Sequence, residues 1–240
     1  MKNLFFIIAI VLLLPSCSSG QFDLGKIGKD INNGINHKSL SNQDVIDGLK
    51  QALTIGSQNA SGSASKTDGY FKHPVIKIPF PPQAEKMEKE LRSLGMDKQV
   101  NEFVMTMNRA AEEAAKQAAP IFVDAVKGMT ITDGMNILKG KDTAATSYLR
   151  QKTSFSLHDK FKPVILTATQ KVEVTKYWNP LITTYNKIPF VDHLNPDLEE
   201  YITQSALSGL FYLVSQEEVK IRKDPAARVT DLLKKVFGSQ

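Results

Sequence analysis

The pattern of apolar and polar positions is clearest between Asn101 and Arg150, a stretch that the rest of the chain is predicted to pack around. Apolar residues recur there at the spacing of one face of an amphipathic α-helix. That face consists of Phe103, Val104, Met107, Ala110, Ala111, Ala114, Ala115 and Ala118. The opposite face consists of Arg109, Glu112, Glu113 and Lys116. Because alanines replace large side chains along the helix, we expect a neighbouring helix to approach its C-terminal half closely, and Glu112 to form a solvated pair with Lys116.

Prolines, glycines and capping residues divide the remainder of this stretch. Pro120 cannot lie inside a helix without the loss of a backbone hydrogen bond, so it is predicted to end the first helix and to begin the next. Thr130 and Asp133 have the spacing of a capping box for a short helix that Gly140 ends. Asp142 is predicted to cap a third helix.

The flanking sequence repeats this alternation of helices and proline-containing segments. A helix begins at Ser41, residues 59–69 are predicted to form a polar loop, and residues 73–82 are extended. A second extended segment lies between Asn186 and Pro196. Further helices are predicted at 83–94, 154–170, 172–186, 197–222, which is the longest, and 225–238. The pattern therefore predicts an all-α fold, a single compact bundle of about eight helices with two short extended proline-containing segments.

Composition agrees with one globular domain and limits the chemistry. The chain has 240 residues, of which 42% are hydrophobic and 23% charged. Its single cysteine, Cys17, excludes an internal disulfide and a multi-thiolate metal site. The net charge of +5 comes from scattered lysines, whereas nucleic-acid binding requires clustered basic residues, so no nucleic-acid partner is predicted.

The N-terminus has the pattern of an export signal. Lys2 precedes an apolar run at residues 4–14 that is too short to span a bilayer. The run ends in Leu14-Pro15-Ser16-Cys17, which resembles the lipobox of bacterial lipoproteins, where the cysteine is acylated. The alternative is an ordinary signal peptide in which Cys17 has no role. The predicted division is a lipoprotein signal peptide at 1–16, a lipidated flexible tether at 17–39 and a helical domain at 40–238.

The residues after the cysteine bear on the membrane. Several acyl chains on Cys17 would anchor the mature chain stably. Lipoproteins with Asp after the cysteine tend to stay at the inner membrane, but Ser18, Ser19 and Gly20 follow here. The resemblance therefore implies a location in the cell envelope, lipid-anchored at the periplasmic face of the outer membrane.

A search for catalytic and metal-binding patterns yields few candidates. The four histidines stand in separate segments, and none has the i, i+4 spacing of a helical metal site. A Gly-x-Ser-x-Gly elbow and glycine-rich phosphate loops are absent from the sequence. We therefore expect neither a metal nor a cofactor, and no standard hydrolase or nucleotide-dependent enzyme.

The most unusual polar residues are Glu217 and Glu218, which project into the apolar arc of the 197–222 helix. Buried carboxylates need partners, and Arg222 and Arg228 are within reach in sequence. One interpretation is an ion-pair network that joins the last two helices. The other is a pair of carboxylates with perturbed acidity in a cleft. The candidate polar network or site comprises Asn108, Arg109, Glu112, Glu217, Glu218, Arg222 and Arg228.

Four stretches together resemble a bacterial exported family, domain of unknown function 4197. They are VIKIPFPP (75–82), NRAAEEAA (108–115), MTITDGMNILKGKDTAATSYLR (129–150) and ALSGLFYLVSQEEVKIRKDPAARVTDLLKKVFG (206–238). The resemblance implies a helical, periplasm-facing domain, often on a signal peptide or a lipoprotein anchor. It implies no activity, cofactor or catalytic residue.

Three functions follow as hypotheses. The first is a non-catalytic binding or scaffolding domain, anchored through acylated Cys17, with a small molecule or an envelope protein as its partner. The second is a cell-envelope enzyme that uses Glu217 and Glu218 with Arg222 or Arg228. The third is a periplasmic carrier of a lipid or an apolar small molecule, which requires a dry cavity.

Overall fold

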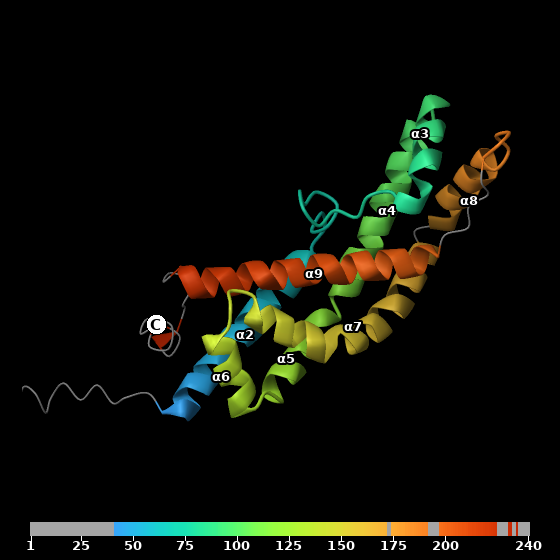
Figure 1. Ribbon diagram of the computed structural model, residues 1–240. Helices are drawn as coiled ribbons and strands as arrows, with labels where there is room; N and C mark the ends of the chain where they lie inside the picture. Colours follow the sequence, from blue (N-terminus) through green and yellow to red (C-terminus); the bar gives the residue numbers. More distant parts are fainter. Residues whose placement is uncertain (1–40, 172–173, 192–196, 225–229, 232–233, 235–240) are drawn as a thin grey trace, which may run out of the picture. The chain divides into compact units, whose positions relative to one another are not determined.

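Helices and their connections make up the described part of the chain, residues 41–171, 174–191, 197–224, 230–231 and 234 of a computed structural model (Figure 1). The chain divides into two units, Met1–Ser39 and Leu40–Gln240, and the described residues all belong to the second. The predictions for Cys17 and Arg228, and most of the predicted 225–238 helix, lie outside them.

The all-α prediction is confirmed: the described ranges contain eight α-helices, one 3-10 turn and no β-strand. The elements are α2 (Asn42–Ala64), η1 (Pro82–Ala84), α3 (Glu85–Ser93), α4 (Asp97–Ala115), α5 (Ala118–Lys127), α6 (Ile131–Lys139), α7 (Ala144–Lys171), α8 (Val174–Tyr185) and α9 (Leu198–Lys223). None of these helices combines the length and apolar character needed to cross a bilayer.

The helices α4, α7 and α9 connect the parts of this unit. Helix α9 packs against α2, α7 and α4, while α5 packs against α2 and α7. Helices α3 and α8 pack against α4 and against each other. Figure 1 shows α3 and α8 grouped with α4 at one end, and α2, α5 and α6 at the other. The core therefore runs along α4 from one group to the other.

The predicted apolar face of α4 is buried at all eight positions, including Ala118 at the start of α5. In the N-terminal half of α4, the centroid of the Phe103 ring lies 4.7 Å from that of Trp178 and 5.2 Å from that of Phe80. The expected pairing of Glu112 with Lys116 is wrong. Glu112 is only 4% exposed, and Lys116 binds Glu113 at 2.5 Å instead. The reason is that the connection after α2 covers the part of α4 that carries Glu112.

Helix α2 is longer than predicted, because residues 59–64 continue it instead of forming a loop. Its small residues let α9 come close: a Cβ at Gly56 would lie 3.3 Å from the Cβ of Glu217. Ala60 and Ala64 are also buried. Small residues are therefore contact positions here, although in sequence they look like a loop.

Helix α7 is one element where two were predicted. It runs through Pro163, which lies on an exposed side, and with 28 residues it exceeds the 26 of α9. Asp142 lies before its first turn, and its carboxylate binds Lys223 at 2.9 Å. The proline costs one backbone hydrogen bond, and the packing of α7 against α4 and α9 compensates this cost.

Helix ends were predicted better than helix lengths. Ser41 and Asp44 form a capping box at the start of α2, and Thr130 and Asp133 form the predicted one at α6. Gly140 is the C-cap of α6. The prediction that residues 73–82 are extended is wrong in part, because residues 74–76 form turns and Pro82 begins η1, while 77–79 have no regular structure. In the second segment, residues 186–190 form turns and a bend, and 192–196 lie outside the described residues.

The connection between α2 and η1 is fixed to the helical core by its own side chains. The Tyr70 hydroxyl donates to the Ala206 carbonyl at 2.6 Å, and burial raises the pKa of that hydroxyl. A Cβ at Gly209 would lie 2.8 Å from the Tyr70 ring and 2.9 Å from Ile76. Only glycine therefore lets this connection lie so close to α9, and the connection forms part of the site described next.

Candidate functional site

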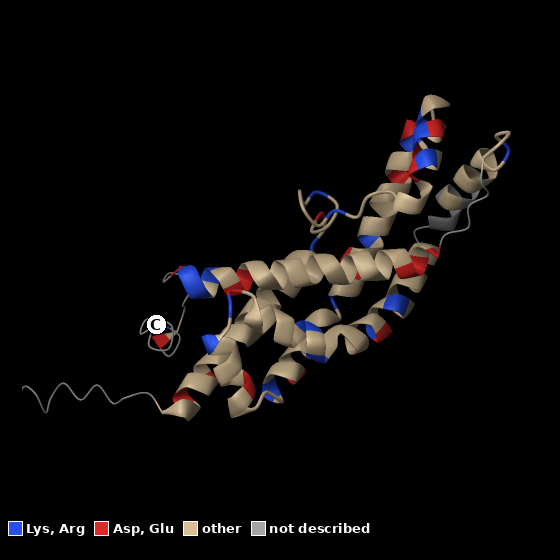
Figure 2. Ribbon diagram, viewed as in Figure 1, with Lys and Arg blue, Asp and Glu red and all other residues tan. Residues whose placement is uncertain are grey.

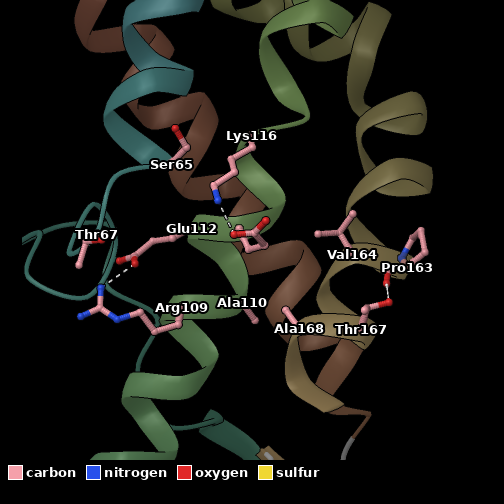
Figure 3. A pocket seen from close by; sticks show the side chains of 11 residues that line it. Ser65, Thr67, Arg109, Ala110, Glu112, Lys116, Pro163, Val164, Thr167 and Ala168 are labelled. Carbon is pink, nitrogen blue, oxygen red and sulfur yellow. Dashed lines mark hydrogen bonds and ion pairs between the residues drawn. The ribbon is translucent and has the colours of Figure 1, made fainter. Parts of the chain in front are cut away.

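A groove of about 680 Å³ lies between α4, α7 and the turn that follows α2 (Figure 3). Helix α4 provides its charged wall, and Ser65 and Thr67 lie on the turn. Helix α7 provides an apolar wall with Pro163, Val164 and Ala168. The volume falls in the range of small-molecule sites, and the two walls differ in polarity, which suits an amphipathic ligand.

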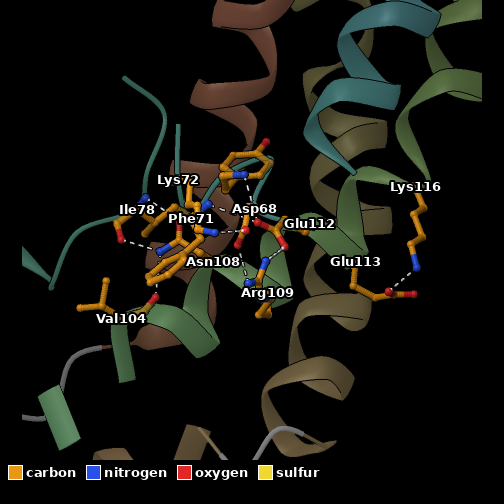
Figure 4. A network of polar contacts seen from close by, with 11 residues as sticks. Asp68, Phe71, Lys72, Ile78, Val104, Asn108, Arg109, Glu112, Glu113 and Lys116 are labelled. Atoms are coloured by element: carbon orange, nitrogen blue, oxygen red, sulfur yellow. Dashed lines mark hydrogen bonds and ion pairs between the residues drawn. The ribbon is translucent and has the colours of Figure 1, made fainter. Parts of the chain in front are cut away.

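The charged wall is built on a salt-bridged arginine. One guanidinium nitrogen of Arg109 lies 2.6 Å from Glu112, and the other lies 2.5 Å from Asp68 (Figure 4). The carboxylate of Glu112 also accepts the backbone N–H groups of Tyr70 and Phe71, at 3.1 and 3.2 Å. This network joins the turn after α2 to the middle of α4.

The bound carboxylates and the guanidinium stabilise each other in their charged forms. Hydrogen bonds from Lys72 and Arg109 hold the pKa of Asp68 below its usual range. Burial disfavours the charged Arg109, but its bonds with Glu112 and Asp68 outweigh that effect and raise its pKa. The guanidinium also lies 5.5 Å from the centroid of the Phe71 ring, within cation–π range.

Asp68 holds an uncommon backbone conformation, with a φ of 68°. Aspartate tolerates this left-handed region better than most residues, but at some cost in free energy. Its two ion pairs, with Arg109 and with Lys72 at 2.8 Å, compensate that cost. The strained residue therefore lies at the edge of the groove, where its side chain fixes one wall.

Asn108 has a structural role next to this network. Its side-chain amide donates to the Ile78 carbonyl and accepts from the Ile78 N–H, both at 2.8 Å. It also donates to the Val104 carbonyl. Asn108 thus pairs with an irregular backbone segment as a strand would, which satisfies buried groups that lack a sheet partner.

Glu218 and Arg222 form a second buried network, at the N-terminus of α7. The Glu218 carboxylate accepts the N–H groups of Ala145 and Thr146 at 2.9 and 2.8 Å, and the Thr146 hydroxyl at 2.7 Å. Arg222 donates to Glu218 at 3.0 Å and to the Ile137 carbonyl at 2.9 Å. A carboxylate at a helix N-terminus satisfies free N–H groups and is favoured by the helix dipole.

Glu217 belongs to neither network. One of its oxygens accepts from Asn59 at 2.9 Å and the other binds Lys220 at 2.5 Å, beside a groove of about 500 Å³ between α2 and α9. The candidate network of the sequence is thus divided into three places, since Asn108 and Arg109 bind residues 68–78 instead of approaching Glu218. The role of Arg228 stays a prediction.

Several site residues were missed because their partners are distant in sequence. Asp68, Tyr70 and Phe71 lie 41 or 42 positions from their partners on α4, and Thr146 lies 72 from Glu218. No local spacing announces such pairs. The same holds for Glu200, which binds His158 and Lys162 of α7.

The charged side chains of the groove wall offer both hydrogen-bond donors and acceptors. No group of three or more His, Cys, Asp or Glu side chains that could hold a metal exists within the described ranges. On the groove wall, the positive charges of Arg109 and Lys116 balance the negative charges of Glu112 and Glu113. The wall can donate and accept hydrogen bonds without a net charge.

Fold and site together define an all-α domain with an amphipathic groove beside Arg109 and two networks in which a buried glutamate binds an arginine. The chain belongs to the family described as protein of unknown function DUF4197, whose model matches residues 39–238. Asn108, Arg109, Glu112, Glu218 and Arg222 all lie within the matched region. No curated protein and no solved structure matches this chain.

Proposed function

We propose that this chain is a lipid-anchored, non-catalytic binding module of the cell envelope, which holds its ligand in the groove beside Arg109. The observation that carries the proposal is the way the groove is built. The charges on this side fix the wall: Glu112 and Asp68 bind Arg109, and two backbone N–H groups bind Glu112. The groove itself stays open between a charge-balanced wall and an apolar one.

The pre-formed walls favour binding of a neutral amphipathic ligand. Ion pairs that are satisfied before the ligand arrives keep the wall rigid, which lowers the entropic cost of association. The apolar side of the ligand would contact Pro163 and Val164, and its polar side would contact Thr67 and Lys116. A small molecule of the envelope or a segment of an envelope protein would have these properties.

The two alternative functions have weaker support. An enzyme that uses Glu217 and Glu218 needs a carboxylate open to a substrate. Glu218 accepts five hydrogen bonds, and both oxygens of Glu217 already have partners. A lipid carrier needs a dry cavity, whereas one wall of the groove beside Arg109 is charged.

The proposed anchor rests on the sequence of the N-terminus. The lipobox-like Leu14-Pro15-Ser16-Cys17 follows an apolar run, and Ser18 then favours the outer membrane. A tether of residues 17–39 would let the domain bind its ligand away from the lipid surface.

Binding can be tested by native mass spectrometry of the mature chain purified in detergent. We expect a bound molecule in the wild type, and its occupancy should fall below about a tenth with Thr167→Trp, which fills the groove from α7. Ser156→Trp is the matched control, since Ser156 is exposed on the same helix outside the groove lining. A ligand that persists in both variants would place the site elsewhere.

The anchor has its own test. Cys17→Ala should release the chain from the membrane fraction in folded form, and the wild-type mature chain should carry acyl mass on its first residue. A variant that stays in the membrane, or a wild type of unmodified mass, would contradict the anchor without affecting the groove.

A further inference from the structure

A second groove, of about 500 Å³, runs along α2 on the side that meets α9. Its α2 side extends from Ile55 to Ser63, roughly 12 Å at the rise of an α-helix, and Lys66 follows in the turn after α2. Helix α9 contributes Glu217, Lys220 and Ile221. Gly62 opens the middle of the groove, since a Cβ there would meet nothing within 4 Å. This surface takes no part in the groove beside Arg109.

Most polar side chains that line this second groove are exposed to solvent and have few partners among the described residues. The side chains of Gln58, Ser63 and Lys66 make no hydrogen bond or ion pair with any described residue. Asn59 uses one N–H on Glu217, which leaves its carbonyl oxygen free of described donors. Together these side chains place amide, hydroxyl and ammonium groups in one row, next to the apolar Ile55.

The charge of the groove is positive. Lys66 and Lys220 stand against one carboxylate, Glu217, and both oxygens of that carboxylate already have partners. A ligand acid would meet the ammonium of Lys66 with no competing anion attached to it. Charge-assisted hydrogen bonds of this kind are stronger than neutral ones.

We propose that this groove binds an anionic sugar, a polyhydroxylated unit with one carboxylate or phosphate. The acid group binds Lys66 and Lys220, the hydroxyl groups exchange hydrogen bonds with Gln58, Asn59 and Ser63, and the apolar ring face lies on Ile55. Amides and hydroxyls suit a polyol because each can both donate and accept. A peptide fits less well, since the groove has neither a free strand edge nor a series of apolar pockets among its lining residues.

The test is a calorimetric titration of the mature chain, in a detergent without a sugar head group and at low salt. Glucuronate, glucose 6-phosphate and glucose serve as the ligands. We expect at least one anionic sugar to bind about tenfold more tightly than glucose, and Lys66→Ala to remove that difference. Lys86→Ala is the matched control, because Lys86 is an exposed lysine of α3 outside the groove.

Each outcome decides the proposal. Tighter binding of glucuronate than of glucose 6-phosphate identifies a carboxylate as the preferred acid, and the reverse identifies a phosphate; both support an anionic sugar. Three results would overturn the proposal: the same affinity for glucose as for the anionic sugars, the same loss of anionic-sugar affinity in Lys66→Ala and Lys86→Ala, or no saturable binding. The Thr167→Trp variant should bind these sugars as the wild type does, which separates this groove from the one beside Arg109.

Discussion

Glu112 and Glu218 are two buried glutamates that bind the same kinds of partner but have very different surroundings. They are 4% and 6% exposed, and each binds two backbone N–H groups and an arginine of its own helix. The N–H groups at Glu112 come from an irregular turn beside a groove of about 680 Å³. Those at Glu218 come from the first turn of α7, with a gap of only about 20 Å³ nearby.

The difference shows how one arrangement can serve two purposes. At α7 the carboxylate replaces a capping residue and joins α9 to α7, so it acts on the core. At α4 it positions a connection that would otherwise lack a regular partner, so it acts on the groove wall. Loss of the Glu218 carboxylate should therefore lower the global stability most, whereas loss of the Glu112 carboxylate should affect mainly the groove wall.

The largest effect is expected from Glu218→Ala. The change leaves the Arg222 guanidinium and two helix N–H groups without their carboxylate, and removal of one member of a buried pair costs roughly 3–5 kcal/mol. Urea unfolding of the purified chain measures this loss. Glu217→Ala is the control: its partners Asn59 and Lys220 border an open groove, so the loss should stay below roughly 1 kcal/mol. Equal losses at the two positions would contradict the role given to Glu218.

Glu112→Ala should cost less, about 2–3 kcal/mol, because the partly exposed Arg109 can be hydrated again and keeps Asp68 as a partner. The specific result is local. Hydrogen exchange at the Tyr70 and Phe71 amides should accelerate, while the amides of the α7 helix stay protected. Glu113→Ala removes only the exposed pair with Lys116 and should leave exchange unchanged. Uniform acceleration across the chain would show that Glu112 acts on the whole core.

A third carboxylate, that of Glu200, is partly exposed and can be compared with the two buried ones. Bonds from Lys162, Gln204 and His158 lower its pKa to about 2. Because its folded pKa lies below the unfolded value of roughly 4.3, the stabilisation is present above that value and is lost as pH falls toward 2. Solvent screening limits the effect to below about 1 kcal/mol. Glu200→Gln should therefore flatten the decline of stability between about pH 5 and pH 2, measured by urea unfolding; an unchanged slope would contradict this.

The elements that sequence predicts well are those encoded within one helical turn. Capping at Ser41 and Thr130 and the apolar face of α4 each depend on residues three or four positions apart, and all were predicted. The length of α2 was not predicted, because Gly56 and Ala60 have no large apolar side chain that would mark a buried helix face. Only the structure shows that Gly56 lies close to α9 and that Ala60 is buried.

The candidate site shows the same limit. Arg109, Glu112 and Glu218 could be selected as unusual polar residues on apolar helices, but their partners could not. Asp68 lies 41 positions from Arg109, in a turn whose backbone conformation no propensity fixes. Spacing reveals which charges need a partner, whereas only the packing of helices reveals which partner they have.

The smallest effect concerns two buried hydroxyl groups of α2, those of Ser57 and Ser61. Both are buried, and among the described residues neither hydroxyl has a hydrogen-bond partner. Ser57→Ala and Ser61→Ala should each raise the free energy of unfolding by up to about 1 kcal/mol, since they remove an unsatisfied group and improve helix propensity. The same substitution at Ser41, whose hydroxyl accepts from Asp44, should lower it by about 1 kcal/mol. If the free energy of unfolding rises at Ser57 and Ser61 but falls at Ser41, then the hydrogen-bond partners of a serine, and not its burial alone, decide its contribution to stability. A fall at all three positions would mean that the two buried hydroxyls are bonded in solution.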